Sequence, residues 1–219
     1  MGTKAIGIIP ARWGSTRFPG KPLSLISGKT LIQRVYENAS CCRSLDAVIV
    51  ATDDERILKH VEGFGGKVVL TSSDCETGTD RLAQAVSLYP SCQGYEIVVN
   101  IQGDEPCLPP EVIEKVVSML KEDPDAVSAT TVTLLKPEDA DNSSIVKCVK
   151  DLHDNALYFS RALIPGNLKE RFNPAVHYYR HMGLYAYRAD FLKVFGALPA
   201  TPLQLAENLE QLKVLEHGY

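Results

Sequence analysis

Cationic side chains are concentrated near the start of the chain, in the segment from Ile8 to Pro22. Arg12, Arg17 and Lys21 are spread through a stretch that also holds three prolines and several small residues. An apolar run precedes this segment, and apolar periodicity resumes only near Leu31. A strand, a cationic loop and a helix in that order are typical of α/β proteins that hold a phosphate at the carboxyl edge of a sheet.

The spacing in this loop matches neither of the phosphate-binding patterns that are built mainly on glycine. It contains no Gly-x-Gly-x-x-Gly, and Gly-x-x-x-x-Gly-Lys-Ser/Thr would need a different spacing. The positive charge would therefore come from side chains, above all those of Arg12 and Lys21. An ordinary surface loop would explain a single solvated arginine, but it fits poorly with three cations directly after a buried-type strand.

A carboxylate, Asp104, is the second candidate for chemistry. It follows another apolar run, within Gln102-Gly103-Asp104-Glu105-Pro106. Mg²⁺ prefers hard oxygen ligands and often takes one or two carboxylates together with substrate phosphates. The alternative is a turn aspartate that hydrogen-bonds its own backbone. Because the cationic loop is expected at the same edge of the sheet, we favour a metal ligand.

Other polar residues next to apolar runs have two open interpretations. Asp53 and Asp54 follow a strand-like run, and Asp53 is interpreted as a helix cap rather than a ligand. Gly78, Thr79 and Arg81 stand at the start of an expected helix, with Thr79 as its cap. These three residues could equally contact a nucleotide.

Four residues in the second half of the chain complete the set of candidates. Arg161 is suited to binding a carboxylate through two parallel hydrogen bonds. His181 lies at the edge of an apolar run, where a lone histidine is more often structural than catalytic. Glu210 and Gln211 lie off the leucine stripe of the last expected helix, a position that usually means solvated surface.

The elements that must position these residues alternate along the first part of the chain. Strands that are almost continuously apolar, separated by helices, indicate a parallel sheet covered on both faces. Ligands then bind beyond the carboxyl ends of the strands, where the cationic loop, Asp53 and Asp104 all fall. The expected strands are residues 5–9, 47–51, 68–70, 97–101 and 127–134, with helices over 30–40, 55–64, 79–88 and from Pro110 onward.

After about Pro137 the pattern changes to shorter strands. They are expected at 145–149, 156–160 and 183–187, followed by a helix from Pro202 to Leu215 with Leu205, Leu209 and Leu212 on one stripe. We therefore divide the chain into an α/β core (1–136), a β-rich second lobe (137–201) and a helix that returns to the core (202–219). The second lobe could close on a substrate or pair with another chain.

Composition excludes several classes of function. A net charge of −4 over 219 residues argues against a protein that binds nucleic acid or anionic membranes over its whole surface. No apolar run approaches the roughly 20 residues that a membrane span needs. The expected first strand leaves no room for a signal peptide. With six cysteines and no Cys-x-x-Cys pair, we expect a cytoplasmic protein with free thiols.

Several segments together resemble the cytidylyltransferases that activate acidic sugars, in the branch that acts on 3-deoxy-D-manno-octulosonate (Kdo), the CMP-Kdo synthetases. The resemblance runs over essentially the whole chain in the right order. It implies a nucleotide-diphospho-sugar transferase-like, Rossmann-like fold, a mostly parallel sheet sandwiched by helices with a small β-rich second lobe. The matching segments are Ile8–Pro22, Gln102–Pro106, Ala156–Ala162 with Ile164-Pro165, Arg180–Tyr185 and Leu209–Leu212.

The resemblance implies a transfer of CMP from CTP to the anomeric hydroxyl of Kdo, with release of pyrophosphate, for lipopolysaccharide biosynthesis. Arg12, Lys21 and Asp104 would be catalytic, with Asp104 holding Mg²⁺. The second lobe, 137–201, would bind the sugar and form a homodimer. The implied nucleotide contacts are Ala11, Arg12, Ser15, Lys21, Gly78, Thr79, Arg81 and Gln102, and the implied sugar contacts are Gln102, Arg161, His181, Glu210 and Gln211.

One departure from the family pattern concerns the metal. The family has a further aspartate, in a Gly-Val-Asp-Thr-Pro-like motif after the Glu-Gln helix, whereas this chain ends at Tyr219 before any such motif. We therefore expect the natural protein to continue and to turn over better with that tail.

The alternatives differ in their motifs. A CMP-sialic acid synthetase shares the first loop but not Gln102–Pro106 or Tyr158–Arg161, and a sugar-1-phosphate nucleotidyltransferase has a differently spelled first loop. A nucleotide-binding homologue with weak catalysis is disfavoured by Arg12, Lys21 and Asp104 together.

Overall fold

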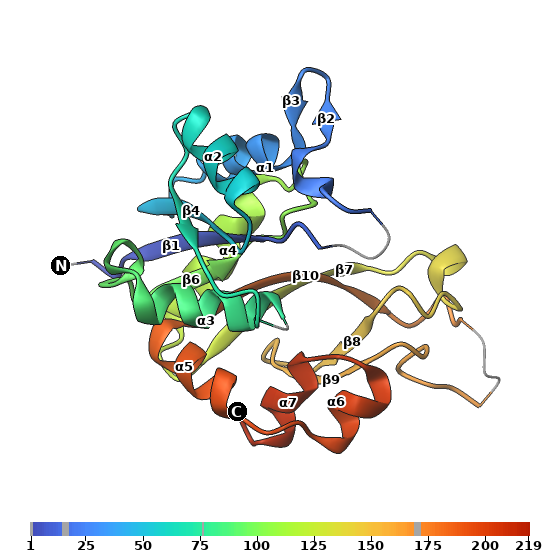
Figure 1. Cartoon of the computed structure of the whole chain (residues 1–219). Helices are drawn as coiled ribbons and strands as arrows, with labels where there is room; N and C mark the ends of the chain where they lie inside the picture. Colours follow the sequence, from blue (N-terminus) through green and yellow to red (C-terminus); the bar gives the residue numbers. More distant parts are fainter. Residues whose placement is uncertain (1, 15–17, 76, 169–171) are drawn as a thin grey trace. The chain divides into compact units, whose positions relative to one another are not determined.

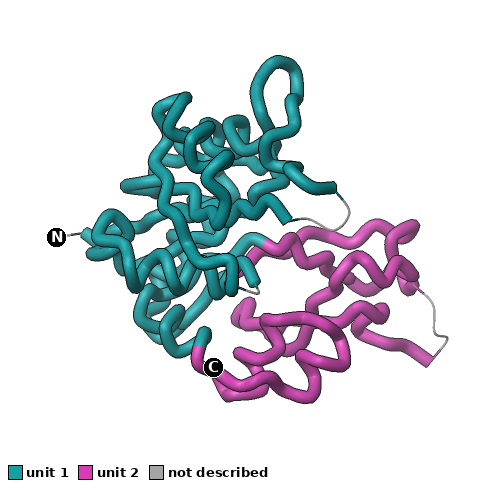
Figure 2. The backbone as a smooth tube through the Cα atoms, in the orientation of Figure 1, with its two compact units in different colours: residues 1–129, 184–196 teal, residues 130–183, 197–219 magenta. Residues whose placement is uncertain are grey.

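The structure is a computed structural model, and it describes residues 2–14, 18–75, 77–168 and 172–219. The chain forms two compact units, shown in different colours in Figure 2. Unit 1 contains residues 1–129 and 184–196, and unit 2 contains residues 130–183 and 197–219. These bounds differ from the divisions expected at 136 and 201, because the chain returns to unit 1 after residue 183. The assignment of separate functions to the lobes stays a prediction.

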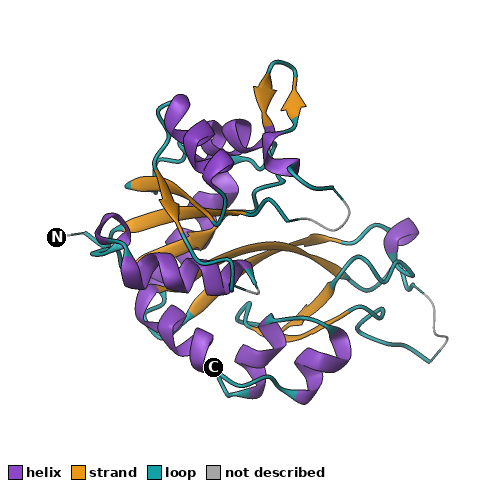
Figure 3. Ribbon diagram, in the orientation of Figure 1, coloured by secondary structure: helices purple, strands orange, loops and turns teal. Residues whose placement is uncertain are grey.

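Unit 1 is built on a mostly parallel sheet. Strand β1 (Ala5–Ala11) lies between β4 (Ala47–Thr52) and β6 (Ile97–Asn100) and is parallel to both. Strand β5 (Val68–Leu70) runs parallel to β4, and the last part of β10 (Tyr179–Arg188) runs antiparallel to β6. Figure 3 shows these strands in orange. The mostly parallel, Rossmann-like sheet expected from the apolar runs is therefore confirmed.

Helices cover both faces of this sheet, as Figure 1 shows. On one side, apolar residues of three helices join alternate residues of the strands, among them Ile9, Val50 and Val99, in one buried cluster. Two further helices lie on the other side, where Tyr187 of β10 contacts Phe195. The first group is α1 (Leu31–Ala39), α2 (Glu55–Gly63) and α4 (Pro110–Glu122), and the second is α3 (Gly78–Leu88) and α5 (Ala189–Ala197).

The helix caps correct two expectations. Helix α3 begins at Gly78, and Thr77 caps it, because its side chain accepts a hydrogen bond from the backbone N–H of Asp80 while the Asp80 carboxylate accepts one from Thr77. Thr79 is thus buried in the first turn and is not the cap. Asp54, rather than Asp53, caps α2 through the backbone N–H of Arg56.

Several short elements had no counterpart in the sequence-based expectations. Strands β2 (Leu25–Ile26) and β3 (Lys29–Thr30) form a separate hairpin. Its turn residues Ser27 and Gly28 both have positive φ, which suits a tight two-residue turn. Short 3₁₀ turns occur at Lys21–Leu23, Pro90–Cys92 and Pro137–Asp139.

Unit 2 is smaller and antiparallel. Strand β8 (Lys147–Lys150) pairs with β9 (Ala156–Ser160) and with the first residues of β10, and β7 (Ser128–Leu134) also pairs with β10. Its buried cluster consists of Cys148, Phe159, Leu209 and Leu212. This confirms the expectation of a small β-rich second part of the fold.

The prediction of a single helix from Pro202 to Leu215 is wrong. The segment forms two short helices, α6 (Pro202–Glu207) and α7 (Gln211–Glu216). Asn208 ends α6 in the left-handed conformation with φ 51°, which asparagine tolerates better than most residues. As a result Leu209 and Leu212 are buried, whereas Leu205 is 69% exposed.

Among the residues that the structure describes, no helix has the length and apolar character that a membrane span requires.

Candidate functional site

The carboxyl ends of the parallel strands in unit 1 meet at one edge, as expected. Strand β1 leads into Arg12, β4 into Asp53, and β6 into the segment that ends at Asp104. A cavity of about 740 Å³ opens at this edge. The residues that line it come from the end of β1 and the segment after it, the first residue of α1, the loop after β6, and the start of α3 with the loop before it: Pro10, Ala11, Arg12, Phe18, Lys21, Pro22, Leu31, Cys75, Thr77, Gly78, Arg81, Gln102, Gly103 and Asp104.

Close packing at a glycine brings two of these loops together. A Cβ atom at Gly103 would lie 2.9 Å from the carbonyl oxygen of Pro10, closer than real Cβ contacts come. Gly78 is packed less tightly, since a Cβ there would lie 3.5 Å from Cγ of Pro10. The absence of a side chain at Gly103 therefore lets the loop that carries Asp104 lie directly against the loop that carries Arg12.

An ion pair spans the cavity between the two loops. Lys21 Nζ lies 2.7 Å from Asp104 Oδ2, and the two side chains are 40% and 52% exposed. Arg12 is also exposed, and it has no ion-pair partner in the part of the chain that the structure describes. Exposed ion pairs contribute only about 0–1 kcal/mol to the free energy of unfolding. Lys21 and Asp104 can therefore separate at little cost, and each can then pair with another charged group.

The donor set at Asp104 fits a hard divalent cation whose other ligands come from a substrate. Within residues 2–14, 18–75, 77–168 and 172–219, no group of three or more His, Cys, Asp or Glu side chains is placed to hold a metal. Mg²⁺ is commonly bound by one or two carboxylates together with phosphates and water. A single half-exposed carboxylate in a cavity that Arg12 and Lys21 also line suits that kind of site.

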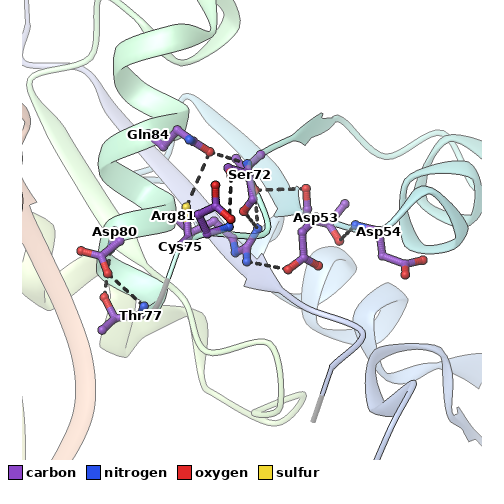
Figure 4. A network of polar contacts seen from close by, with 11 residues as sticks. Asp53, Asp54, Ser72, Cys75, Thr77, Asp80, Arg81 and Gln84 are labelled. Carbon is purple, nitrogen blue, oxygen red and sulfur yellow. Dashed lines mark hydrogen bonds and ion pairs between the residues drawn. The ribbon is translucent and has the colours of Figure 1, made fainter.

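Arg81 is held by the protein itself (Figure 4). Its side chain is 3% exposed, and Nη2 donates to Asp53 Oδ2 at 2.8 Å. Nη1 donates to the hydroxyl of Thr71 and to the carbonyl oxygen of Ser72. Arg81 therefore joins the start of α3 to the ends of β4 and β5. It borders the cavity, and its expected contact with a nucleotide stays a prediction.

The structure brings most of the expected nucleotide residues to one cavity. Ala11, Arg12, Lys21, Gly78, Arg81 and Gln102 all line it, together with the expected metal ligand Asp104. Thr79 does not, because it is buried within α3, and Ser15 lies outside the described residues. Thr77 also lines the cavity, although it was not expected to. The capping-box pattern Thr-x-x-Asp, from Thr77 to Asp80, is the signal that could have identified it.

The expected sugar-binding residues other than Gln102 all lie in unit 2. Arg161 donates from Nε to the carbonyl oxygen of Glu207 at 2.8 Å and from Nη2 to that of Asn208 at 3.2 Å. Nη1 donates to the carbonyl oxygen of Ser143. The guanidinium thus fixes the turn between α6 and α7, just before Glu210. Its role as a carboxylate ligand stays a prediction.

His181 is largely enclosed within unit 2. Its Nε2 lies 2.8 Å from the hydroxyl of Thr130, and its ring meets that of Phe159 edge-on. Burial lowers the pKa of His181 to about 4, so the imidazole is neutral near pH 7. Glu210 and Gln211 are half-buried at the start of α7. The neutral imidazole and the Gln211 amide can hydrogen-bond sugar hydroxyls without adding charge, and the Glu210 carboxylate can accept hydrogen bonds from them.

The known proteins that are similar to this chain include cytidylyltransferases. The family model described as Cytidylyltransferase matches residues 6–219. The 3-deoxy-manno-octulosonate cytidylyltransferase of Protochlamydia amoebophila is 60% identical, over 100% of this chain and 85% of the relative. The enzyme of the same name from Zea mays is 52% identical, over 99% and 72%. A solved structure of CMP:2-keto-3-deoxy-manno-octonic acid synthetase complexed with CTP matches with a TM-score of 0.91 and 40% identity, over 99% of this chain and 87% of that one.

Proposed function

The chain belongs to the cytidylyltransferase family, and on that premise we propose that it transfers CMP from CTP to the anomeric hydroxyl of Kdo, releasing pyrophosphate. The observation that carries the proposal is the cavity at the carboxyl edge of the sheet, where Arg12, Lys21, Gln102 and Asp104 meet. The names of the relatives support the choice of sugar, and the CTP bound in the structural neighbour supports the choice of nucleotide.

The two cations of the first loop would bind the triphosphate. Attack at the α-phosphate builds negative charge on the phosphate oxygens and on the departing pyrophosphate. Arg12 and Lys21 are anchored in the loop next to β1, so they would stabilise that charge without a large rearrangement. When CTP enters, Lys21 would leave Asp104 and pair with phosphate oxygens instead. Breaking the pair would cost little free energy because both side chains are exposed.

Asp104 would hold Mg²⁺, with Gln102 beside it in the same loop. When bound there, the ion would neutralise phosphate charge and lower the pKa of the sugar hydroxyl. The close packing of Gly103 on Pro10 would fix the distance between the Asp104 carboxylate and the cationic loop.

The sugar acid would be bound by Gln102 and by residues of unit 2. We assign His181, Glu210 and Gln211 to hydrogen bonds with sugar hydroxyls, and Arg161 to the sugar carboxylate or to the turn that presents Glu210. The product is an activated sugar for lipopolysaccharide biosynthesis. We further propose that the protein works as a cytoplasmic homodimer and binds neither nucleic acid nor membranes.

A nucleotide and sugar-acid panel tests the proposed function. Pyrophosphate release would be measured with CTP, UTP, ATP or GTP, each with Kdo or with a sialic acid, with and without Mg²⁺. We expect turnover only with CTP, Kdo and Mg²⁺ together. Turnover with sialic acid instead of Kdo would contradict the choice of sugar, and turnover independent of Mg²⁺ would contradict the metal.

Within this panel, the Asp104→Ala variant tests the metal assignment. We expect turnover to fall by about 10³-fold or more, because the charge stabilisation organised by the carboxylate is lost. CTP affinity, measured by calorimetry, should fall far less, since Arg12 and Lys21 remain. Retained turnover in this variant would show that Asp104 does not hold the metal.

A further inference from the structure

The first loop contains Trp13, the single tryptophan of the chain. Trp13 closes the base of this loop, since its carbonyl oxygen accepts a hydrogen bond from the backbone N–H of Gly20 at 3.0 Å. Its ring also packs on Gly20, where a Cβ atom would lie 2.9 Å from the ring atom Cη2. Gly20 has φ 71°, a conformation that favours glycine. Both the backbone and the ring of Trp13 therefore hold Gly20 in place.

The ring of Trp13 is also held by a residue from another element. The guanidinium carbon of Arg56, in the first turn of α2, lies 3.3 Å from the ring centroid. This distance is well within the range of a cation–π interaction, for which tryptophan is the best acceptor. The contact joins the loop after β1 to the helix after β4.

Arg56 is in turn fixed by the cap of α2. Its Nε donates to Asp54 Oδ1 at 2.9 Å and its Nη2 donates to Asp54 Oδ2 at 2.6 Å, so the two groups pair through two hydrogen bonds. The backbone N–H of Arg56 donates to the same carboxylate at 2.9 Å. These hydrogen bonds from Arg56 lower the pKa of Asp54 and keep it ionised. Asp54 therefore orients the guanidinium that covers Trp13.

The cationic residues of the cavity lie directly on either side of this arrangement. Arg12 precedes Trp13, and Lys21 follows Gly20. Both cations line the cavity, whereas Trp13, Arg56 and Asp54 are not among its lining residues. The three residues can therefore affect a bound phosphate only through the placement of Arg12 and Lys21.

We propose that Trp13, Arg56 and Asp54 form a clamp that sets the spacing of Arg12 and Lys21 for the triphosphate of CTP. The three are positioning residues of the cytidylyltransferase reaction, and in this respect the inference rests on the proposed function. A rigid spacing would matter because both cations must reach the phosphates of one nucleotide at the same time.

Steady-state kinetics of Arg56→Ala and Trp13→Ala test the clamp. We expect KM for CTP to rise about fivefold to tenfold in each variant, which corresponds to the free energy of one cation–π contact. KM for Kdo should stay within about twofold of its value in the unchanged chain. The double variant should be no worse than either single variant, because each substitution breaks the same clamp. If KM for CTP stays within twofold in both single variants, the clamp does not position the cations.

Conservative and matched variants separate positioning from general loss of structure. Arg56→Lys and Trp13→Phe keep a cation and an aromatic ring, so they should recover most of the CTP affinity. Lys59→Ala removes a cation one turn further along α2, where the lysine pairs with exposed Glu55. It should leave KM for CTP unchanged. An equal rise in KM for Lys59→Ala would show a general charge effect and would overturn the clamp.

Tryptophan fluorescence tests the clamp without any substrate, because Trp13 is the only source of this signal. Acrylamide should quench Trp13 about twofold more strongly in Arg56→Ala than in the unchanged chain or in Lys59→Ala, because the guanidinium no longer covers the ring. Equal quenching would overturn the clamp whether or not the protein uses CTP. If Trp13 is quenched more strongly in Arg56→Ala but the unchanged protein shows no turnover of CTP, the clamp is supported and the proposed function is overturned.

Discussion

Two of the cation–carboxylate pairs in unit 1 have similar distances and opposite surroundings. Lys21 and Asp104 are 2.7 Å apart, with side chains 40% and 52% exposed. Arg81 and Asp53 are 2.8 Å apart, with side chains 3% and 17% exposed. Both pairs lie at the carboxyl edge of the same parallel sheet, and in both the two residues come from segments that are far apart in the sequence.

The difference lies in what each pair can do when a charged ligand arrives. The exposed pair can open, because water and ions replace each partner at little cost. The buried pair cannot, because either partner alone would leave a poorly solvated charge. The geometry thus separates two tasks that the sequence does not distinguish. Lys21 and Asp104 are available to bind substrate, whereas Arg81 and Asp53 hold the start of α3 against the ends of β4 and β5.

Arg81→Met should have the largest effect on stability. The substitution keeps most of the side-chain volume but leaves Asp53, Thr71 and the carbonyl of Ser72 without their donor. We expect the free energy of unfolding, measured in urea, to fall by about 3 kcal/mol. This value is at the lower end of the range for breaking a buried ion pair, because Asp53 keeps some contact with solvent. A loss below about 1 kcal/mol would mean that the pair is no more structural than an exposed one.

His181 extends the comparison to a partly buried titratable group in unit 2. Its folded-state pKa is lowered by burial from 6.5 to about 4. Between these values the unfolded chain binds a proton that the folded chain does not, so the free energy of unfolding falls as the pH drops. The stabilisation is complete above pH 6.5, and about 2 kcal/mol of it should be lost by pH 5.

Urea unfolding at pH 7.5 and pH 5 measures this loss, with His181→Asn as the matched control. Asparagine can still hydrogen-bond the hydroxyl of Thr130 but does not titrate. Whatever its stability at pH 7.5, the variant should lose about 2 kcal/mol less than the unchanged chain between the two pH values. An identical loss in both proteins would show that His181 can be protonated in the folded state without cost.

The fold and the edge that carries the cavity were predictable because burial is visible in sequence. Strand β4 is buried along its entire length, and its run Ala47–Thr52 is correspondingly apolar. A polar residue in the loop after such a run, as Asp104 is in the loop after β6, must emerge at the carboxyl edge of a parallel sheet. The parallel sheet and the loops at its carboxyl edge therefore follow from local patterns.

Contacts between distant residues could not be predicted in the same way. Asp53 looked like a helix cap, and only the folded chain shows that Arg81, from the start of α3, pairs with it. Arg56 likewise has no local signal that connects it with Trp13. The break at Asn208 was hidden because the leucine spacing on either side continues a helical pattern. Each of these features depends on packing partners or on one backbone conformation, rather than on periodicity.

The smallest expected stability change belongs to the exposed pair, and it is the sharpest test of the comparison. Lys21→Met should change the free energy of unfolding by less than about 0.5 kcal/mol, because the pair is open to solvent and Asp104 remains hydrated without it. Urea unfolding at low and at high salt would measure this. Turnover with CTP should nevertheless fall by about 10²-fold, since a fixed cation near the leaving pyrophosphate is lost. A stability loss comparable to that of Arg81→Met would refute the distinction between the two pairs, because Lys21 would then be too costly to release for substrate.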